Sequence, residues 1–497
     1  MLQQADIDAI RGKPVQAREL LINGAFRPSK SGETLTIISP IDGSELTTIA
    51  SAGQEDVDDA VAAARGSFES GVWSKASPAE RKKVLFRVAE LIERHALELA
   101  VLGVRDNGTE IGMAMRGEPG SAAATFRYYA EAIDKVAGEV ANTAQNYFGM
   151  AQREPVGVVG AIVPWNFPLM ISAWKLAPAL AVGNSVVIKP AESASLSLLR
   201  LAELALEAGL PEGVLNVVTG RGSVTGEALA LHMDVDVLVF TGSGTIGRRL
   251  LEYSARSNIK RVYLELGGKS PNIVFADAPD IDAAVKGSVN GMFRNSGQVC
   301  VAGSRLLVQK SIAEEFTEKL VATANELKVG DPLNLDSDVG AVANAEQLGV
   351  DLKYVDVARN EGATLATGGN QILEETGGYY MQPTVFTGVD SQMTIAQEEV
   401  FGPVLSVIEF DDADDAVRIA NSTPYGLAAG VWTSNLTTAH QMVSAIRSGV
   451  VHVNCYGGAP ISLPMGGMKQ SGNGYDRSLH ALDKFTNLKT AWFSLAL

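Results

Sequence analysis

Short apolar runs alternate with helical segments along most of this chain, and no other feature constrains its fold as strongly. "VGVVGAIVPW" (156–165) and "RVYLELGG" (261–268) are apolar over the length of a strand, whereas "SLSLLRLAELALEAGLP" (195–211) has helical periodicity. Strands that are apolar at nearly every position are typical of a parallel sheet covered by helices on both faces. The second half repeats the alternation from "NIVFADA" (272–278) to "VVHVNC" (450–455). The sequence therefore predicts two α/β domains.

The chain of 497 residues is long enough for two or three domains. We expect the two α/β domains to meet near residues 262–270. The start "SPAERKK" (77–83) predicts a helix N-terminus, with Ser77 as the cap and Pro78 at the first helical position. The polar, weakly periodic stretch at 138–155 has two interpretations, a hairpin that leaves the first domain or a surface loop.

Charge and cysteine content exclude several classes of protein. A net charge of −16 argues against a nucleic-acid partner or an anionic membrane surface. The beginning of the chain has no apolar stretch typical of a secretory signal, and no uncharged run is long enough to cross a membrane. Two cysteines 155 residues apart fit a reducing compartment. We therefore expect a cytoplasmic protein.

A glycine-rich turn indicates a nucleotide site. "FTGSGTIGRRL" (240–250) follows an apolar strand, opens a helix and places Gly242, Gly244 and Gly247 in a G-x-G-x-x-G pattern. Glycines at this spacing let backbone N–H groups approach a pyrophosphate at the helix N-terminus. Glu265 follows Gly247 by 18 residues, where this fingerprint expects an acid that holds a ribose. At this point Glu265 has two possible roles, in cofactor binding or in catalysis.

Cys300 lies in a stretch of small and polar residues, "NSGQVCVAGS" (295–304), where a substrate can reach the sulfur. The simpler interpretation is a small buried residue that fills space. A thiol, a carboxylate after a strand and a dinucleotide loop together favour covalent redox catalysis instead. For Cys455, the other cysteine, a filling role is expected.

Several ordered motifs over nearly the whole chain resemble the NAD(P)+-dependent aldehyde dehydrogenase superfamily. The matching stretches are "VPWNFPL" (163–169), "GNSVVIKPAE" (183–192), "FTGS" (240–243), "LELGGKSPNIVF" (264–275), "GQVC" (297–300), "EEVFGPVLSV" (398–407), "NSTPYGLAAGVWT" (421–433) and "PMGGMKQSGNG" (464–474). The tail "SLHALDKFTNLKTAW" (478–492) is similar to bacterial enzymes that oxidise γ-glutamyl-γ-aminobutyraldehyde or guanidinobutyraldehyde.

The resemblance implies catalytic roles for four residues. Cys300 would attack the aldehyde carbon as a thiolate. The side chain of Asn166 and the backbone N–H of Cys300 would stabilise the oxyanion that forms. Glu265 would activate the water that hydrolyses the thioester, and Lys175 would help to relay the proton.

The resemblance also implies a cofactor site. Glu192 would hold the adenosine ribose beside Lys189, which leaves Glu265 for catalysis. Because a carboxylate at Glu192 repels a 2′-phosphate, we expect NAD+ rather than NADP+ as the cofactor. No metal is expected. The remaining predicted cofactor contacts are Ile162, Val163, Trp165, Gly222, Phe240, Thr241, Gly242, Ser243, Ile246, Leu266, Gln347, Glu399 and Phe401.

The substrate prediction depends on departures from the resemblance. Relatives that act on amino aldehydes carry acids around the tunnel mouth, but "YGGAPISLPMGG" (456–467) has none. An apolar or aryl aldehyde, of the phenylacetaldehyde or indole-3-acetaldehyde type, is therefore favoured, although the tail favours an ω-amino, γ-glutamylamino or guanidino aldehyde. Asp106, Glu110 or Glu118 could supply the missing charge. The predicted tunnel residues are Phe167, Met170, Trp174, Val299 and Val301, with Tyr128 and Tyr129.

The resemblance implies two Rossmann-like parallel-sheet domains and a small β oligomerisation element. The predicted division is 1–134 with 154–263 for NAD binding, 264–472 for catalysis, and 135–153 with 473–497 for assembly into a homodimer or homotetramer. Two other functions stay open. Coenzyme A instead of water could resolve the thioester, which Glu265 argues against. A non-catalytic scaffold is the alternative of another class, which intact Cys300, Asn166 and Glu265 argue against.

Overall fold

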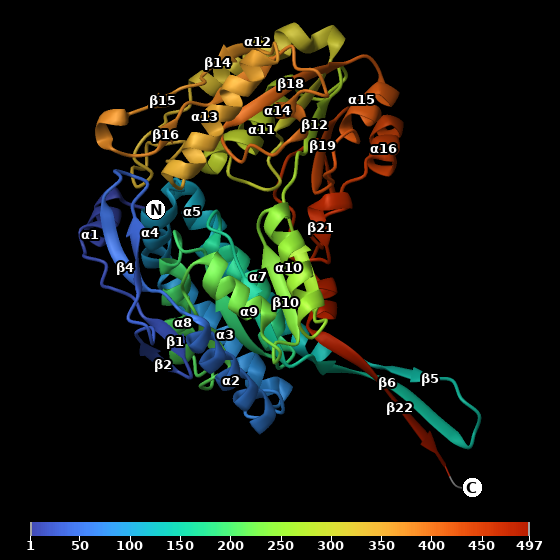
Figure 1. Ribbon diagram of the computed structural model, residues 1–497. Helices are drawn as coiled ribbons and strands as arrows, with labels where there is room; N and C mark the ends of the chain where they lie inside the picture. Colours follow the sequence, from blue (N-terminus) through green and yellow to red (C-terminus); the bar gives the residue numbers. More distant parts are fainter. Residues whose placement is uncertain (1, 496–497) are drawn as a thin grey trace.

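The computed structural model describes residues 2–495 and contains two large sheets, one built from residues 20–265 with 472–473 and the other from residues 271–453 (Figure 1). The strands of the first sheet are parallel from β9 to β11, and its edge strands β1, β2 and β21 are antiparallel to their neighbours. In spatial order they are β2 (Ala25–Arg27), β1 (Leu20–Ile22), β9 (Leu215–Val217), β8 (Ser185–Lys189), β7 (Val158–Ile162), β10 (Val237–Thr241), β11 (Arg261–Glu265) and β21 (Gly472–Asn473).

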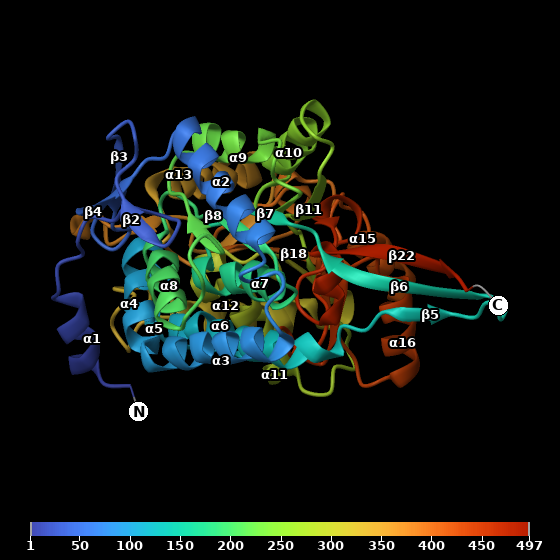
Figure 2. The same cartoon turned by 90° about the horizontal axis from the view of Figure 1, so that it is seen from below.

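Helices cover both faces of this sheet (Figure 2), which explains why its central strands are apolar throughout. Val159 and Ala161 of β7 pack into one core, whereas Val158 and Ile162 pack into another on the opposite face. The first core contains residues of α3 (Pro78–Arg94), α6 (Pro119–Ala132), α7 (Pro168–Ala181) and α8 (Leu196–Glu207). The second contains residues of α2 (Gln54–Ser70), α9 (Glu227–Leu231) and α10 (Gly244–Arg256).

The second sheet is parallel except for its edge strand β14. Its order is β14 (Thr364–Thr367), β17 (Thr384–Thr387), β18 (Val404–Phe410), β13 (Arg305–Gln309), β12 (Pro271–Val274), β19 (Ala428–Trp432) and β20 (Val450–Val453). One face packs against α11 (Ile281–Phe293) and α12 (Ala313–Asn325). The other packs against α13 (Ala345–Asn360), α15 (Ala413–Ala420) and α16 (Leu436–Ala445). The predicted α/β architecture is confirmed.

A three-stranded antiparallel sheet extends away from the body of the molecule (Figure 1). It joins β5 (Glu139–Ala141), β6 (Tyr147–Pro155) and β22 (Thr486–Ser494). The stretch at 138–155 is thus a hairpin rather than a surface loop. Its apolar side chains are exposed: Trp492 is 60% accessible and stacks on Tyr147 with ring centroids 5.2 Å apart.

The remaining elements complete the two halves, and the three-part domain division predicted above stays our proposal. They are α1 (Gln4–Arg11), β3 (Thr34–Ile38), β4 (Glu45–Ala50), α4 (Ala96–Asn107), α5 (Ile111–Gly117), β15 (Gln371–Ile372), β16 (Tyr380–Met381) and α14 (Thr394–Gln397). Within residues 2–495, none of the helices is both long and apolar enough to cross a membrane.

Candidate active site

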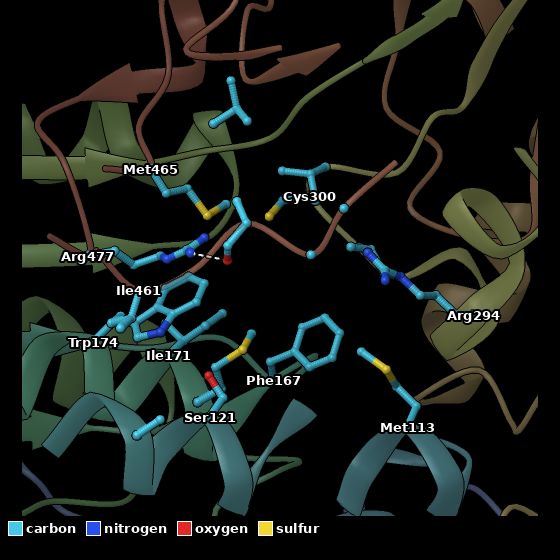
Figure 3. Close-up of a pocket in the computed structure, with 18 of the residues that line it drawn as sticks. Met113, Ser121, Phe167, Ile171, Trp174, Arg294, Cys300, Ile461, Met465 and Arg477 are labelled. Atoms are coloured by element: carbon cyan, nitrogen blue, oxygen red, sulfur yellow. Dashed lines mark hydrogen bonds between the residues drawn. The ribbon is translucent and has the colours of Figure 1, made fainter. Parts of the chain in front are cut away.

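Two cavities meet at Cys300. The first, of about 320 Å³, is lined mainly by apolar side chains (Figure 3), and the second, of about 300 Å³, lies beside β10 and β11. The residues that line both are Cys300 and Ile171. A thiol in this position can contact a molecule in either cavity, so a group bound in one can react with a group bound in the other.

Backbone conformation positions the thiol. Asn295, Ser296 and Gly297 have φ values of 50°, 52° and 73°, in the left-handed region that is costly for residues other than glycine. Hydrogen bonds from several segments hold this turn. Thr109 Oγ1 donates to Asn295 Oδ1 at 2.6 Å, and Ser296 Oγ donates to the Gly340 carbonyl at 2.9 Å. The strained turn is therefore held by the surrounding structure, and it brings Cys300 to the junction of the cavities.

Burial disfavours the charged forms of Cys300 and Glu265. It raises the pKa of the Cys300 thiol to about 12, and the carboxylates of Glu399 and Glu265 act in the same direction. Burial also raises the pKa of Glu265 well above its usual range, helped by the negative charge of Asp476. Glu265 ends β11 and lines the second cavity, where its Oε1 is buried with no hydrogen-bond partner in the described chain. In its ionised form, Glu265 can accept a proton from a water molecule near Cys300.

A buried ionic cluster lies behind Glu265. Asp476 accepts hydrogen bonds from the ammonium groups of Lys175, at 2.5 Å, and of Lys484. All three side chains are at most 3% exposed. Burial lowers the pKa of Lys175, whereas the negative charge of Asp476 opposes this shift. Lys175 was predicted as a proton relay, but Asp476 and Lys484 were not predicted, because Asp476 lies 301 residues after Lys175 and no local pattern brings them together.

Asn166 is buried beside the thiol loop, with its side chain 3% exposed. Its Nδ2 donates to the Gln298 carbonyl at 2.9 Å, and Asn295 Nδ2 donates to the Asn166 carbonyl at 3.1 Å. An amide nitrogen carries two hydrogens, so one N–H remains for another acceptor. Asn166 lines the second cavity together with Cys300, which fits the predicted oxyanion role.

The second cavity brings together many of the predicted cofactor contacts. Phe401, which has a φ of 64°, meets the ring of Trp165 edge-on at 5.4 Å. Glu399 Oε1 accepts a hydrogen bond from the Gly268 N–H at 2.9 Å, and burial raises the pKa of Glu399 to about 7. The predicted residues that line this cavity are Trp165, Thr241, Gly242, Ser243, Leu266, Gln347, Glu399 and Phe401.

The rest of the predicted cofactor site lies near the start of α9 and α10. Lys189 Nζ contacts Glu192 Oε2 at 3.1 Å, and the Gly222 N–H points at Glu192 Oε1 at 3.4 Å. Burial acts to raise the pKa of Glu192, but the Lys189 ammonium and these hydrogen bonds outweigh it and the pKa is lowered. Ile162 and Lys189 lie beside Gly226, Phe240 lies against Gly242, and Ile246 is 37% exposed on α10. Val163 differs: it is 2% exposed and packs in the core that contains α7, so its side chain does not line the cleft.

The first cavity contains every principal residue predicted to contact substrate: Phe167, Met170, Trp174, Val299 and Val301. The prediction for the two tyrosines was wrong. Tyr129 is fully buried and donates its hydroxyl to the Ser478 carbonyl at 2.9 Å, and Tyr128 packs edge-on against it. Neither ring lines the first cavity, and the residues of α6 that do are the small Ser121 and Ala124.

The acids considered for the tunnel mouth are engaged elsewhere. Asp106 accepts from the Leu196 N–H at 2.9 Å, Glu110 from the Asn295 N–H at 3.1 Å and Glu118 from the Met170 N–H at 2.6 Å. None of them lines the first cavity. Two arginines line it instead, Arg294 and Arg477, and neither was predicted although Arg294 lies six residues before Cys300. Cys455 is exposed, so the expected filling role was also wrong.

Comparisons with known proteins agree with this arrangement. The aldehyde dehydrogenase family matches residues 26–491. The NADP/NAD-dependent aldehyde dehydrogenase PuuC of Escherichia coli K12 is 48% identical over 476 residues, which cover 96% of this chain and 95% of PuuC. Two solved structures match over the full length of both chains with TM-scores of 0.98: the indole-3-acetaldehyde dehydrogenase AldA of P. syringae, as a mutant in complex with NAD+ and IAA (50% identical), and the aldehyde dehydrogenase KauB of Pseudomonas aeruginosa (51%). This chain belongs to the aldehyde dehydrogenase family.

Proposed function

We propose that this protein oxidises an aldehyde to a carboxylic acid with NAD+, through a covalent intermediate on Cys300. The observation that carries the proposal is the position of Cys300 between two cavities, one apolar and one lined by the predicted cofactor contacts. The test is NADH formation from an aryl aldehyde and NAD+. NADH formed only with added coenzyme A would indicate the acylating reaction, and no NADH from any aldehyde would indicate a scaffold.

The second cavity and its surroundings fit NAD+. A Cβ on Gly267 would lie 1.9 Å from Glu399 Oε2, so a glycine is required where the backbone passes this carboxylate. Ser243 caps α10, whose N-terminus suits a pyrophosphate. Glu399 and Phe401 would hold the nicotinamide ribose, and Glu192 the adenosine ribose. The chemistry that the bound cofactor supplies is acceptance of the hydride that leaves the substrate carbon.

The reaction starts with attack of the Cys300 sulfur on the aldehyde carbon. A positive charge in the second cavity would lower the pKa of the thiol and favour the reactive thiolate. The free N–H of Asn166 and the backbone N–H of Cys300 would stabilise the tetrahedral oxyanion. After oxidation a thioester links the acyl group to Cys300. Glu265 then takes a proton from water, which attacks the thioester and releases the acid and the thiol.

Glu192→Gln should narrow the preference for NAD+ over NADP+. The carboxylate of Glu192 would repel a 2′-phosphate, and its removal would leave Lys189 free to attract one. We expect the KM for NADP+ to fall by about tenfold, with a smaller change for NAD+. Steady-state kinetics with both cofactors measure the ratio, and Glu207→Gln on the exposed end of α8 is the charge-matched control. An unchanged ratio would refute this role for Glu192.

We propose an apolar or aryl aldehyde rather than an ω-amino aldehyde as the substrate. The side chains of Phe167, Met170 and Trp174 offer an aromatic and thioether surface, and no carboxylate lines the first cavity in the described chain. A cation that enters this cavity would lose water without gaining a partner. The similarity to the P. syringae indole-3-acetaldehyde dehydrogenase supports an aromatic substrate.

Phenylacetaldehyde should therefore give a kcat/KM at least tenfold higher than 3-aminopropionaldehyde. Burial of the ring stabilises the complex by ~25 cal/mol per Å² of apolar surface, and contacts between rings add to this. Butanal, which matches the amino aldehyde in length but carries no charge, separates the effect of charge from that of ring size. A higher kcat/KM for the amino aldehyde than for butanal would contradict the proposal.

We also propose that the protein is a cytoplasmic homodimer or homotetramer. On the protruding sheet, Leu488 and Trp492 of β22 are exposed on one face and Phe493 on the other, so both faces carry apolar surface. Burial of such a surface against a second copy would stabilise an assembly. Light scattering coupled to size-exclusion chromatography measures the oligomeric mass.

A further inference from the structure

We propose that the first cavity selects aldehydes that carry a carboxylate at the end remote from the carbonyl, and that one of the two arginines in its wall, Arg294 or Arg477, binds this group. The inference rests on the proposed function, because it concerns the substrate of that same reaction. It narrows the substrate class from apolar or aryl aldehydes to those with an apolar or aryl spacer and an anionic end.

The guanidinium of Arg294 has no partner among the described residues. Its side chain lines the first cavity, and it forms neither a hydrogen bond nor an ion pair with any residue in 2–495. Its Nε is fully buried without a partner. Its terminal nitrogens lie beside Gly457, about 3.5 Å from where a Cβ at that position would be, so they reach the loop that closes the cavity. A buried guanidinium nitrogen without a partner is costly unless an acceptor binds there.

Arg477 supplies a second cation across the cavity (Figure 3). Its Nη2 donates to the carbonyls of Ala459 and Pro460, and the guanidinium lies 5.8 Å from the ring centroid of Trp174. These contacts orient the guanidinium at the cavity wall and use only one of its terminal nitrogens. The backbone of Arg477 has a φ of 64°, so a strained conformation is maintained at this position.

No acid neutralises these arginines within the cavity. Its titratable lining residues are Arg294, Arg477, His452 and Cys300, and none of them carries a negative charge while the thiol is protonated. Glu110, whose pKa the positive charge of Arg294 acts to lower, does not line the cavity and accepts a hydrogen bond from the Asn295 N–H. Two uncompensated guanidinium groups in a largely apolar cavity create a positive potential that attracts a carboxylate and repels an ammonium.

The dimensions suit a substrate with a spacer. Figure 3 shows Arg294 and Arg477 on opposite sides of the cavity, with Cys300 on one wall and Phe167 and Trp174 on the facing wall. A volume of about 320 Å³ accommodates an aromatic ring with two small substituents. The ring would pack against the apolar wall, the aldehyde would face the thiol, and the carboxylate would face a guanidinium.

The test compares 4-formylbenzoate with 4-formylbenzamide, which have nearly the same shape but differ in charge. Since charge-assisted hydrogen bonds are strong, we expect the wild-type kcat/KM to favour the carboxylate by about 10- to 100-fold. This ratio should fall as KCl is added, because salt screens the attraction. A ratio of one or below, or one that is insensitive to salt, would overturn the inference.

Variants identify the arginine that binds the carboxylate. Because each variant is compared with the wild type on the same two aldehydes, the difference in intrinsic reactivity between the aldehydes drops out. Arg294→Gln should reduce kcat/KM for 4-formylbenzoate at least tenfold, with little change for the amide, whereas Arg294→Lys should retain most of the preference. Arg477→Gln is the second variant. If this variant alone lost the preference for the carboxylate, Arg477 rather than Arg294 would bind it. Arg87→Gln, on the exposed face of α3, changes the net charge equally and should leave the ratio unchanged. If neither cavity variant alters the ratio, the arginines do not bind the carboxylate.

The same measurements separate this inference from the proposed function. If 4-formylbenzamide is oxidised well and the carboxylate is not preferred, the anion inference fails and the aldehyde oxidation stands. If neither aryl aldehyde is oxidised but 3-aminopropionaldehyde is, the proposed substrate class fails together with the inference.

Discussion

Cys300→Ala is expected to lower kcat for aldehyde oxidation by about four orders of magnitude or more, because loss of a covalent nucleophile removes the pathway itself. The thiol lies at the junction of the two cavities. NAD+ affinity should change little, since the predicted ribose contacts, Glu192 and Glu399, are retained. Stopped-flow measurement of NADH absorbance gives kcat, and isothermal titration gives the affinity.

Cys455→Ala is the matched control, because it removes the other thiol, which is exposed. It should retain wild-type kcat. A Cys300→Ala variant that kept more than a few per cent of wild-type kcat would show that Cys300 is not the nucleophile. A variant that lost NAD+ affinity as well as activity would indicate that the turn at 295–297 had rearranged.

Glu265→Gln should convert steady turnover into a burst of one NADH per active site, followed by turnover that is slower by about 10²- to 10³-fold. Hydride loss needs no base at this position, whereas hydrolysis of the thioester needs a group that accepts a proton from water. Mass spectrometry of the quenched enzyme should find the acyl group on Cys300. In the wild type, hydrolysis should become faster as the pH rises. Burial raises the pKa of Glu265, so the carboxylate that acts as the base forms at a higher pH than it does for an exposed glutamate.

Glu399→Gln is the comparison variant for Glu265→Gln. It removes the other buried carboxyl group of the second cavity and should raise the KM for NAD+ without a burst. If Glu265→Gln lost NAD+ affinity and hydrolysed the thioester normally, Glu265 would be the ribose ligand that the G-x-G-x-x-G spacing also allows.

Local sequence patterns predicted much of the architecture. Ser77 accepts the Glu80 N–H and Pro78 opens α3, as the stretch at 77–83 predicts, because a helix cap involves only neighbouring residues. The alternation of apolar strands and helices predicted both sheets, since burial on two faces leaves a continuous apolar run. It could not decide whether 138–155 was a hairpin or a loop, because the strand that pairs with it, β22, lies more than 300 residues along the chain.

The candidate site residues also divide into those that local sequence predicts and those that only the fold reveals. Cys300 and Glu265 stand out in short motifs, but the distance between them in sequence says nothing about the cavities that they share. The predictions for Tyr128 and Tyr129 were wrong because periodicity does not show which face of α6 meets the cavity and which meets the protein core. Arg477 and Asp476 are neighbours in sequence, yet one lines the first cavity and the other joins Lys175 in a buried ionic cluster.

The sequence by itself thus determined the α/β class and predicted the covalent chemistry and an apolar substrate surface, because each depends on residue type and on neighbours within a few positions. Only the tertiary structure decided which charges face the substrate. Asp106, Glu110 and Glu118 bind backbone N–H groups and leave the cavity without a carboxylate, whereas Arg294 and Arg477 enter it without an acidic partner. A side chain's charge acts on a ligand through its distance and desolvation, and both are set by the packing of segments that are remote in sequence.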